Sequence, residues 1–172
     1  NALPLLADLG FTTASLTRTA VRLQRARVAL DQATDQLERI CSSAVMGLAR
    51  QLDREAIVRA PDEIGIRVLR RALNAVGGAG GPAELGDIED AYKRLFRPLT
   101  LTSPVLTLTL GGCILECRTR EAQGPAVVII YREVGRNLGL PIMTLEPGEV
   151  ALWDQRVRVE NHSPSAVTVG PI

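Results

Sequence analysis

Apolar positions in the first half of the chain recur at helical spacing. The clearest series places a leucine at every seventh residue: Leu16, Leu23, Leu30 and Leu37. Small or apolar residues lie between or beyond them on the same side: Ala20, Thr34, Cys41 and Leu48. This spacing predicts one amphipathic helix over about residues 14–50, with a break or bend near Ser42-Ser43 or Gly47. Such a helix is expected to pack in a small bundle.

Two further helices follow, each after a proline. The first begins after Pro61 with Asp62 and Glu63 in its first turn, where acidic groups suit the helix dipole, and ends at Gly77-Gly78. The second follows Pro82. Their expected buried faces are Ile66, Leu69, Leu73 and Val76, and then Leu85, Ile88, Tyr92 and Leu95. Short connections between these helices indicate an antiparallel arrangement.

The pattern changes to alternation and β-branched residues after Arg97-Pro98. Gly111-Gly112 and Asp154-Gln155 are placed to form the turns of two hairpins. The predicted strands are 105–110, 113–119, 126–132, 149–153, 156–160 and 166–169. Residues 134–148 are expected to form a loop. The sequence thus predicts an α+β fold, with an N-terminal antiparallel helical bundle over 1–98 and a small antiparallel β-rich domain built from hairpins over 99–172.

Composition limits the classes of function. Apolar residues make up 46% of the 172 residues and charged residues 23%, as in an ordinary globular protein. Aromatic residues make up only 3%, which disfavours an RNA-binding surface built from stacked rings. The net charge of +1 provides no global field that would attract a nucleic acid.

The motifs that usually carry chemistry are incomplete. "GGAGGPA" fits a dinucleotide fingerprint formally, but it follows a helix rather than a strand, so a helix end and a link are favoured. The one histidine, His162, lies in a polar turn-like segment. Paired carboxylates such as Asp62-Glu63 lie on helix surfaces beside basic residues. We therefore predict no catalytic residue and no metal site.

The three cysteines do not form a disulfide framework. Cys113 and Cys117 lie about 13 Å apart along one strand, too far to bond, and share a face with Leu115. They are expected to be small buried hydrophobes. No signal peptide or long apolar run occurs, which points to the cytoplasm and away from a membrane. The chain starts without Met inside a helical pattern, as a piece of a longer protein would.

Arginine is the more informative residue. Nineteen of the twenty basic residues are Arg, a bias that either codon usage or phosphate recognition would explain. Three of them lie on the long helix opposite the leucines, and others gather on the later helices. The candidate RNA-binding residues are Arg18, Arg22, Arg25, Arg67, Arg70, Arg71, Lys93, Arg94 and Arg97. Equally, these positions suit ordinary solvated helix faces.

The order of several short motifs resembles one protein family. "LPLLADLGF", "LTRTAVRLQRAR" and "DEIGIRVLRRALNAVGG" resemble the helical region of bacterial tRNA(Ile)-lysidine synthetases. "LTLGGCILECR", "VIIYRE" and "LWDQRVRV" are similar to the β segment that follows it. Gln155 and Val157 depart from the Gly and Phe of the family's W-D-G-R-F pattern. The family's S-G-G-x-D-S pyrophosphatase loop does not occur in this chain.

The resemblance implies a function for the whole enzyme. Such an enzyme uses ATP, with Mg, to adenylate the wobble cytidine of an isoleucine tRNA with a CAU anticodon, and then joins lysine to it. This chain would be the C-terminal, tRNA-contacting portion, with no cofactor of its own and no activity alone. Its partners would be the tRNA and its own N-terminal catalytic domain.

The alternative is a structural or interaction module without direct RNA contact. The helical half would then dock on the catalytic domain or on a second subunit as a homodimer, through an exposed apolar strip.

Overall fold

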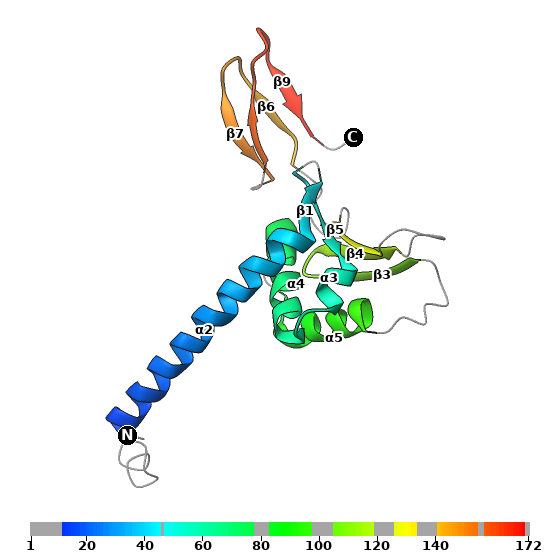
Figure 1. Cartoon of the computed structure of the whole chain (residues 1–172). Coiled ribbons are helices and arrows are strands. Elements are labelled where there is room, and N and C mark those ends of the chain that lie inside the picture. The colour runs from blue at the N-terminus through cyan, green and yellow to red at the C-terminus, as the bar shows by residue number, and fades with distance from the viewer. Residues whose placement is uncertain are drawn as a thin grey trace.

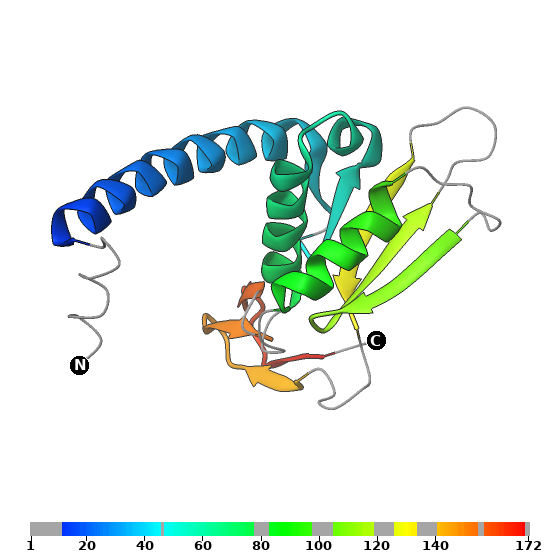
Figure 2. The ribbon, with the colours of Figure 1, turned by 90° about the horizontal axis from the view of Figure 1, so that it is seen from below.

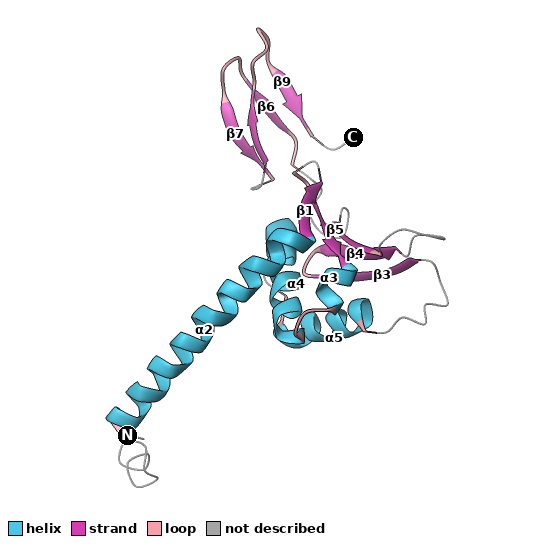
Figure 3. Ribbon diagram, viewed as in Figure 1, coloured by secondary structure: helices cyan, strands magenta, loops and turns pink. Residues whose placement is uncertain are grey.

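A five-stranded antiparallel sheet with helices on one face forms the body of the molecule, and one long helix extends from it (Figures 1 and 3). The computed structural model describes residues 12–45, 47–77, 83–97, 105–118, 126–133, 141–154 and 157–170. A helical region is followed by antiparallel strands joined as hairpins, so the predicted α+β class is confirmed. Figure 2 shows the helices gathered on one side of the sheet.

Helix α2, Thr13–Cys41, is the long helix that the leucine spacing predicts. Thr12 caps its start, because the Thr12 hydroxyl accepts from the backbone N–H of Ser15 and the Ser15 hydroxyl accepts from that of Thr12. Only its last turns are buried, through Thr34, Leu37 and Cys41. The predicted packing of this helix in a small bundle is therefore not seen for its first half, which no described residue covers.

The predicted continuation of this helix to residue 50 is also wrong. The chain leaves the helix at Ser42, where a break was expected, and forms strands β1, Ser42–Val45, and β2, Ala49–Asp53. These two strands pair as an antiparallel hairpin. Gly47, at φ +70°, lies in the turn between them. Leu48, predicted to extend the helical stripe, therefore lies in this turn and is exposed.

Three helices cover the sheet. Helix α3, Arg54–Val58, starts at Asp53, whose carboxylate accepts from the N–H groups of Glu55 and Ala56. Helix α4, Asp62–Gly77, begins and ends where the sequence predicts. Helix α5, Leu85–Phe96, follows. Most of the predicted buried positions are buried, but Ile66 is half-buried and Leu85 is exposed.

An arginine joins two of these helices. Arg54, at the start of α3, donates to the carbonyl oxygens of Leu95, Phe96 and Arg97 at 2.9, 3.2 and 3.1 Å. These carbonyls lie at the end of α5 and have few partners within the helix itself. A cation there also suits the helix dipole. The contact fixes the end of α5 against the start of α3.

The sheet has the strand order β1-β2-β5-β4-β3. Strands β3, Val105–Leu110, and β4, Cys113–Arg118, pair with each other, and β5, Val127–Arg132, pairs with both β4 and β2. One row of paired residues crosses the sheet beneath the helices: Leu52, Val128, Cys117 and Leu106. The buried cysteines of β4 are therefore core residues, as predicted.

The Gly111-Gly112 turn joins β3 to β4 and also touches helix α4. Both glycines have positive φ, +57° and +71°, as a tight hairpin turn requires. The carbonyl oxygen of Gly111 lies so close to Gly77 that a Cβ on Gly77 would be 2.7 Å from it. The turn thus packs backbone against backbone at the end of α4.

The remaining strands form a small unit. Strand β6, Met143–Leu145, which lies in the predicted loop 134–148, pairs with β9, Val167–Val169, and β7, Val150–Trp153, pairs with β8, Val157–Glu160. The buried Asn161 side chain donates to the carbonyl oxygens of Leu145 and Ser165, both at 2.9 Å. An ion pair between Arg132 and the buried Asp154 connects this unit to β5.

The predicted division of the chain into two domains at residue 98 stays a prediction. One sheet continues across it, because β2 precedes the division and β5 follows it. One hydrophobic core does the same, since it runs from Leu37 to Ile130.

We expect Gly77→Ala to destabilise the fold. Its new methyl group would meet the backbone of Gly111, which cannot move without shifting the hairpin, so the free energy of unfolding should fall by about 1–3 kcal/mol. Gly86→Ala is the matched control, because Gly86 also lies in a helix but has open space around it. That variant should gain up to about 1 kcal/mol from helix propensity. Urea unfolding followed by circular dichroism measures both, and equal effects would contradict the packing described.

We also expect stability to fall between pH 9 and 11. Burial, with smaller effects from Asp53 and Glu38, raises the pKa of the Cys41 thiol from 9.0 to about 11. The unfolded chain therefore loses this proton first, and alkaline pH favours unfolding. Tyr92 acts in the same direction at higher pH, because burial and Asp62 raise its pKa to about 12. The urea midpoint should fall less steeply over pH 9–11 in Cys41→Ala; identical slopes would contradict this assignment.

Candidate nucleic-acid interface

The first half of α2 is a helix that no described part of the chain covers (Figure 1). Residues 16–29 are all exposed. At about 100° per residue, Arg18, Arg22 and Arg25 fall within an arc of about 60° on one side. Leu16 and Leu23 lie on another side, 47% and 65% exposed. This segment therefore presents a cationic face and an apolar face in different directions.

The cationic face has no acidic partner among the described residues. No ion pair involves Arg18, Arg22 or Arg25, and the first carboxylate on this helix is Asp31. Asp31 forms an ion pair at 3.7 Å with Arg27, which lies on a different side of the helix. Three guanidinium groups are therefore available to an external anion.

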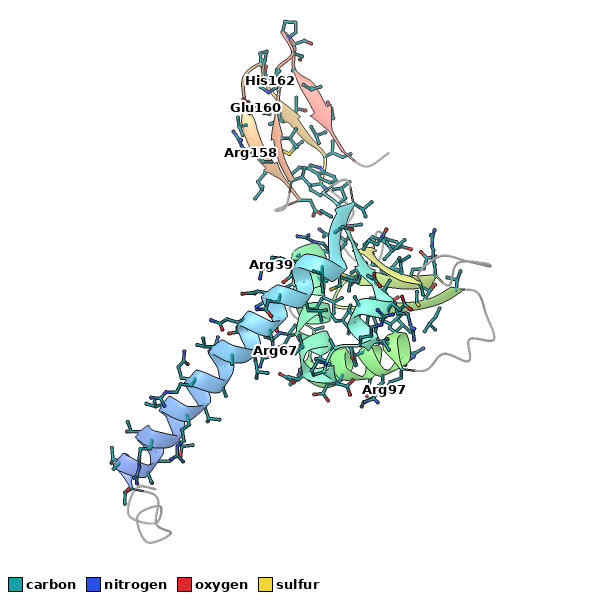
Figure 4. The ribbon with its side chains drawn as sticks, viewed as in Figure 1. Arg39, Arg67, Arg97, Arg158, Glu160 and His162 are labelled. Atoms are coloured by element: carbon teal, nitrogen blue, oxygen red, sulfur yellow. The ribbon has the colours of Figure 1, made fainter. Side chains whose placement is uncertain are left out.

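Arg67 and Arg71 have a different environment. Arg67 bonds Asp31 of α2 at 2.9 Å and Glu63 of its own helix at 2.7 Å. Arg71 bonds Asp35 and Glu38 of α2 at 2.5 and 3.0 Å. Figure 4 shows Arg67 where α2 meets α4. These two predicted RNA-binding residues thus tie α4 to α2, and their charges are matched by carboxylates.

The remaining predicted residues lie on α4 and α5 and at the end of α5. Lys93 bonds Asp90 at 2.9 Å, and Arg97 bonds Asp62. Arg70 and Arg94 are exposed and form no ion pair with a described residue. The nine candidates therefore fall into two groups, those that form an ion pair with a described carboxylate and those that do not. The unpaired group is Arg18, Arg22, Arg25, Arg70 and Arg94.

Two arginines of the structure were absent from the prediction. Arg39, near the end of α2, and Arg50, on β2, line one open groove together with Ser42. Arg39 carried a sequence signal, since it lies a whole number of seven-residue steps after Arg18 and Arg25. Arg50 carried none, because its strand was read as part of a helix.

The structure places the histidine on the surface and the three cysteines in the core. His162 is exposed, as predicted, and lies 3.8 Å from Glu160. Among the described side chains, no group of three His, Cys, Asp or Glu residues could hold a metal ion. The three cysteines are buried and free. No described helix is both long and apolar enough to cross a membrane.

Comparison with known proteins gives a consistent result. The chain is 34% identical over 118 residues to a tRNA(Ile)-lysidine synthase of Methylobacterium sp. (strain 4-46), covering 67% of this chain and 34% of that protein. It is 33% identical over 144 residues to the protein of the same name from Bradyrhizobium diazoefficiens, and this match covers 72% of this chain and 40% of that protein. It is 35% identical over 120 residues to the tRNA(Ile)-lysidine synthase of Rhodopseudomonas palustris, and this match covers 66% of this chain and 34% of that protein.

No family model and no solved structure matches the chain. The chain spans between a third and two fifths of the length of the curated relatives it matches. These matches confirm the family resemblance that the sequence motifs indicate. The chain is a homologue of bacterial tRNA(Ile)-lysidine synthases over about two thirds of its own length.

Proposed function

We propose that this chain is the tRNA-contacting region of an ATP-dependent ligase that joins lysine to the wobble cytidine of an isoleucine tRNA. The function named for its relatives, tRNA(Ile)-lysidine synthase, supports this proposal. ATP, with Mg, and lysine would be bound by the catalytic domain of the whole enzyme. The chain would position tRNA for that domain and would form no lysidine alone.

The exposed arginine face of α2 is the observation that carries the proposal. Positioning a large RNA requires contacts to its phosphates rather than to its bases, and guanidinium groups suit phosphates in charge and shape. Arg18, Arg22 and Arg25 form no ion pair with a described carboxylate. The helix is anchored to the body only at its other end. It can therefore approach an RNA without rearrangement of the core.

The docking alternative rests on the other face of the same segment. Leu16 and Leu23 are exposed apolar side chains at seven-residue spacing, which is a usual contact surface between helices. Contact with the catalytic domain or a second copy would use this face. The two functions require different sides of α2, so measurements of each are separable.

We expect the triple variant Arg18→Gln, Arg22→Gln, Arg25→Gln to bind an isoleucine tRNA transcript at least tenfold more weakly at low salt. The magnitude of the slope of log affinity against log salt concentration should decrease by about 2–3, because binding of the variant releases fewer counterions from the RNA phosphates. Fluorescence anisotropy between roughly 50 and 200 mM salt measures both quantities.

A charge-matched control is available in Arg27→Gln, Arg59→Gln, Arg158→Gln. These arginines are also exposed, at 72%, 75% and 72% of their side-chain surface, but each lies close to a carboxylate. The control should retain most of the affinity. Equal losses in both triple variants would show that only net charge matters. No RNA binding by the wild-type chain, with dimers in sedimentation, would favour the docking function instead.

A further inference from the structure

A groove at the junction of α2 with the β1–β2 hairpin contains two arginines without a carboxylate partner in the described part of the chain. It is lined by Asp35, Glu38, Arg39, Ser42 and Arg50. Arg39 is exposed and Arg50 is half-buried, and neither forms an ion pair with a described residue. Figure 4 shows Arg39 at the end of α2 that adjoins β1. Two guanidinium groups from different elements thus open on one groove.

The two carboxylates of the groove are already engaged. Arg71 reaches them from α4, with its Nη1 atom 2.5 Å from Asp35 and 3.0 Å from Glu38. Both carboxylates are therefore directed toward α4. The hydrogen-bonding capacity of Arg39, Arg50 and the Ser42 hydroxyl remains available to another group. Donors of this type, two of them charged, fit an anion with several acceptor oxygens.

The groove also lies at the end of a continuous row on α2. Arg18, Arg25, Gln32 and Arg39 are spaced by seven residues, so consecutive members are about 10.5 Å apart on nearly the same side of the helix. All four are exposed. At 100° per residue, the acidic residue nearest to this row is Asp35, about 40° from Arg39, and Asp35 is paired with Arg71. The row spans about 31 Å and leads from the free end of α2 to the groove.

We propose that Arg39 and Arg50, with Ser42, bind a backbone phosphate of the same RNA that contacts the free half of α2. The inference rests on the proposed function and adds a second contact region to it, at the anchored end of the helix. Arg39 continues the row, and Arg50 approaches the same phosphate from the sheet. A planar guanidinium binds two phosphate oxygens at once, so two of them from different directions fix the position of the group. The groove therefore sets how far along α2 the RNA lies.

The test compares Arg39→Gln, Arg50→Gln with Arg27→Gln, Arg59→Gln in the full 172-residue chain. Both double variants lose two positive charges, but only the first changes the groove. With the isoleucine tRNA transcript, the groove variant should bind about tenfold more weakly, with a salt slope lower by about 1–2. The control variant should stay within about twofold of wild type. Equal affinity of the two double variants would overturn the inference.

Two further measurements keep the outcomes distinct. Arg39→Gln alone changes an exposed side chain, so it should lower affinity severalfold with an unchanged urea midpoint, whatever the effect of Arg50→Gln on folding. Failure of the proposed function is seen separately, because the wild-type chain would then not bind the tRNA. Binding that depends on Arg18, Arg22 and Arg25 but not on Arg39 would refute the groove contact and leave the proposed function standing.

Discussion

The attachment of α2 to α4 is the interaction on which the proposed interface depends. Thr34, Leu37 and Cys41 bury one side of the last turns of α2 in the core, and Arg67 and Arg71 of α4 hold its acidic side. These half-buried ion pairs are each worth on the order of 1 kcal/mol, so apolar burial supplies most of the stability and the arginines set the orientation. A helix fixed at one end in this way extends its other end into solvent. The arginine face of that free half is positioned by contacts that lie many residues away from it.

The local parts of this fold could be predicted from the sequence. Helices α4 and α5 and strands β3, β4 and β5 are recognisable because each carries its own period and its own proline or glycine boundary. Hairpin β1–β2 could not be recognised, since its strands are four and five residues long and continue an apolar spacing that suits a helix. Its pairing with β5 is a contact between distant segments, on which local patterns carry no information. The same contact explains why the sheet continues across residue 98.

The candidate site was predictable in part, for a related reason. Periodicity places Arg18, Arg22 and Arg25 on one face, and the structure finds them exposed. It does not reveal which arginines pair with α2, because the α2 carboxylates that Arg67 and Arg71 contact lie more than thirty residues away in sequence. The solvent exposure and the ion pairing of an arginine depend on the tertiary structure. Together they distinguish the arginines that hold the fold together from those that are free to bind an external anion.

Photo-cross-linking from opposite sides of α2 tests the central claim most directly. Ala29 lies beside the arginine face, and Ala20 is nine residues away, about 180° around the same helix. Both are small and exposed, so benzoylphenylalanine can replace either one without disturbing the core. The account predicts efficient cross-linking of tRNA from position 29 and little from position 20. Equal cross-linking from both positions, or a preference for position 20, would contradict it.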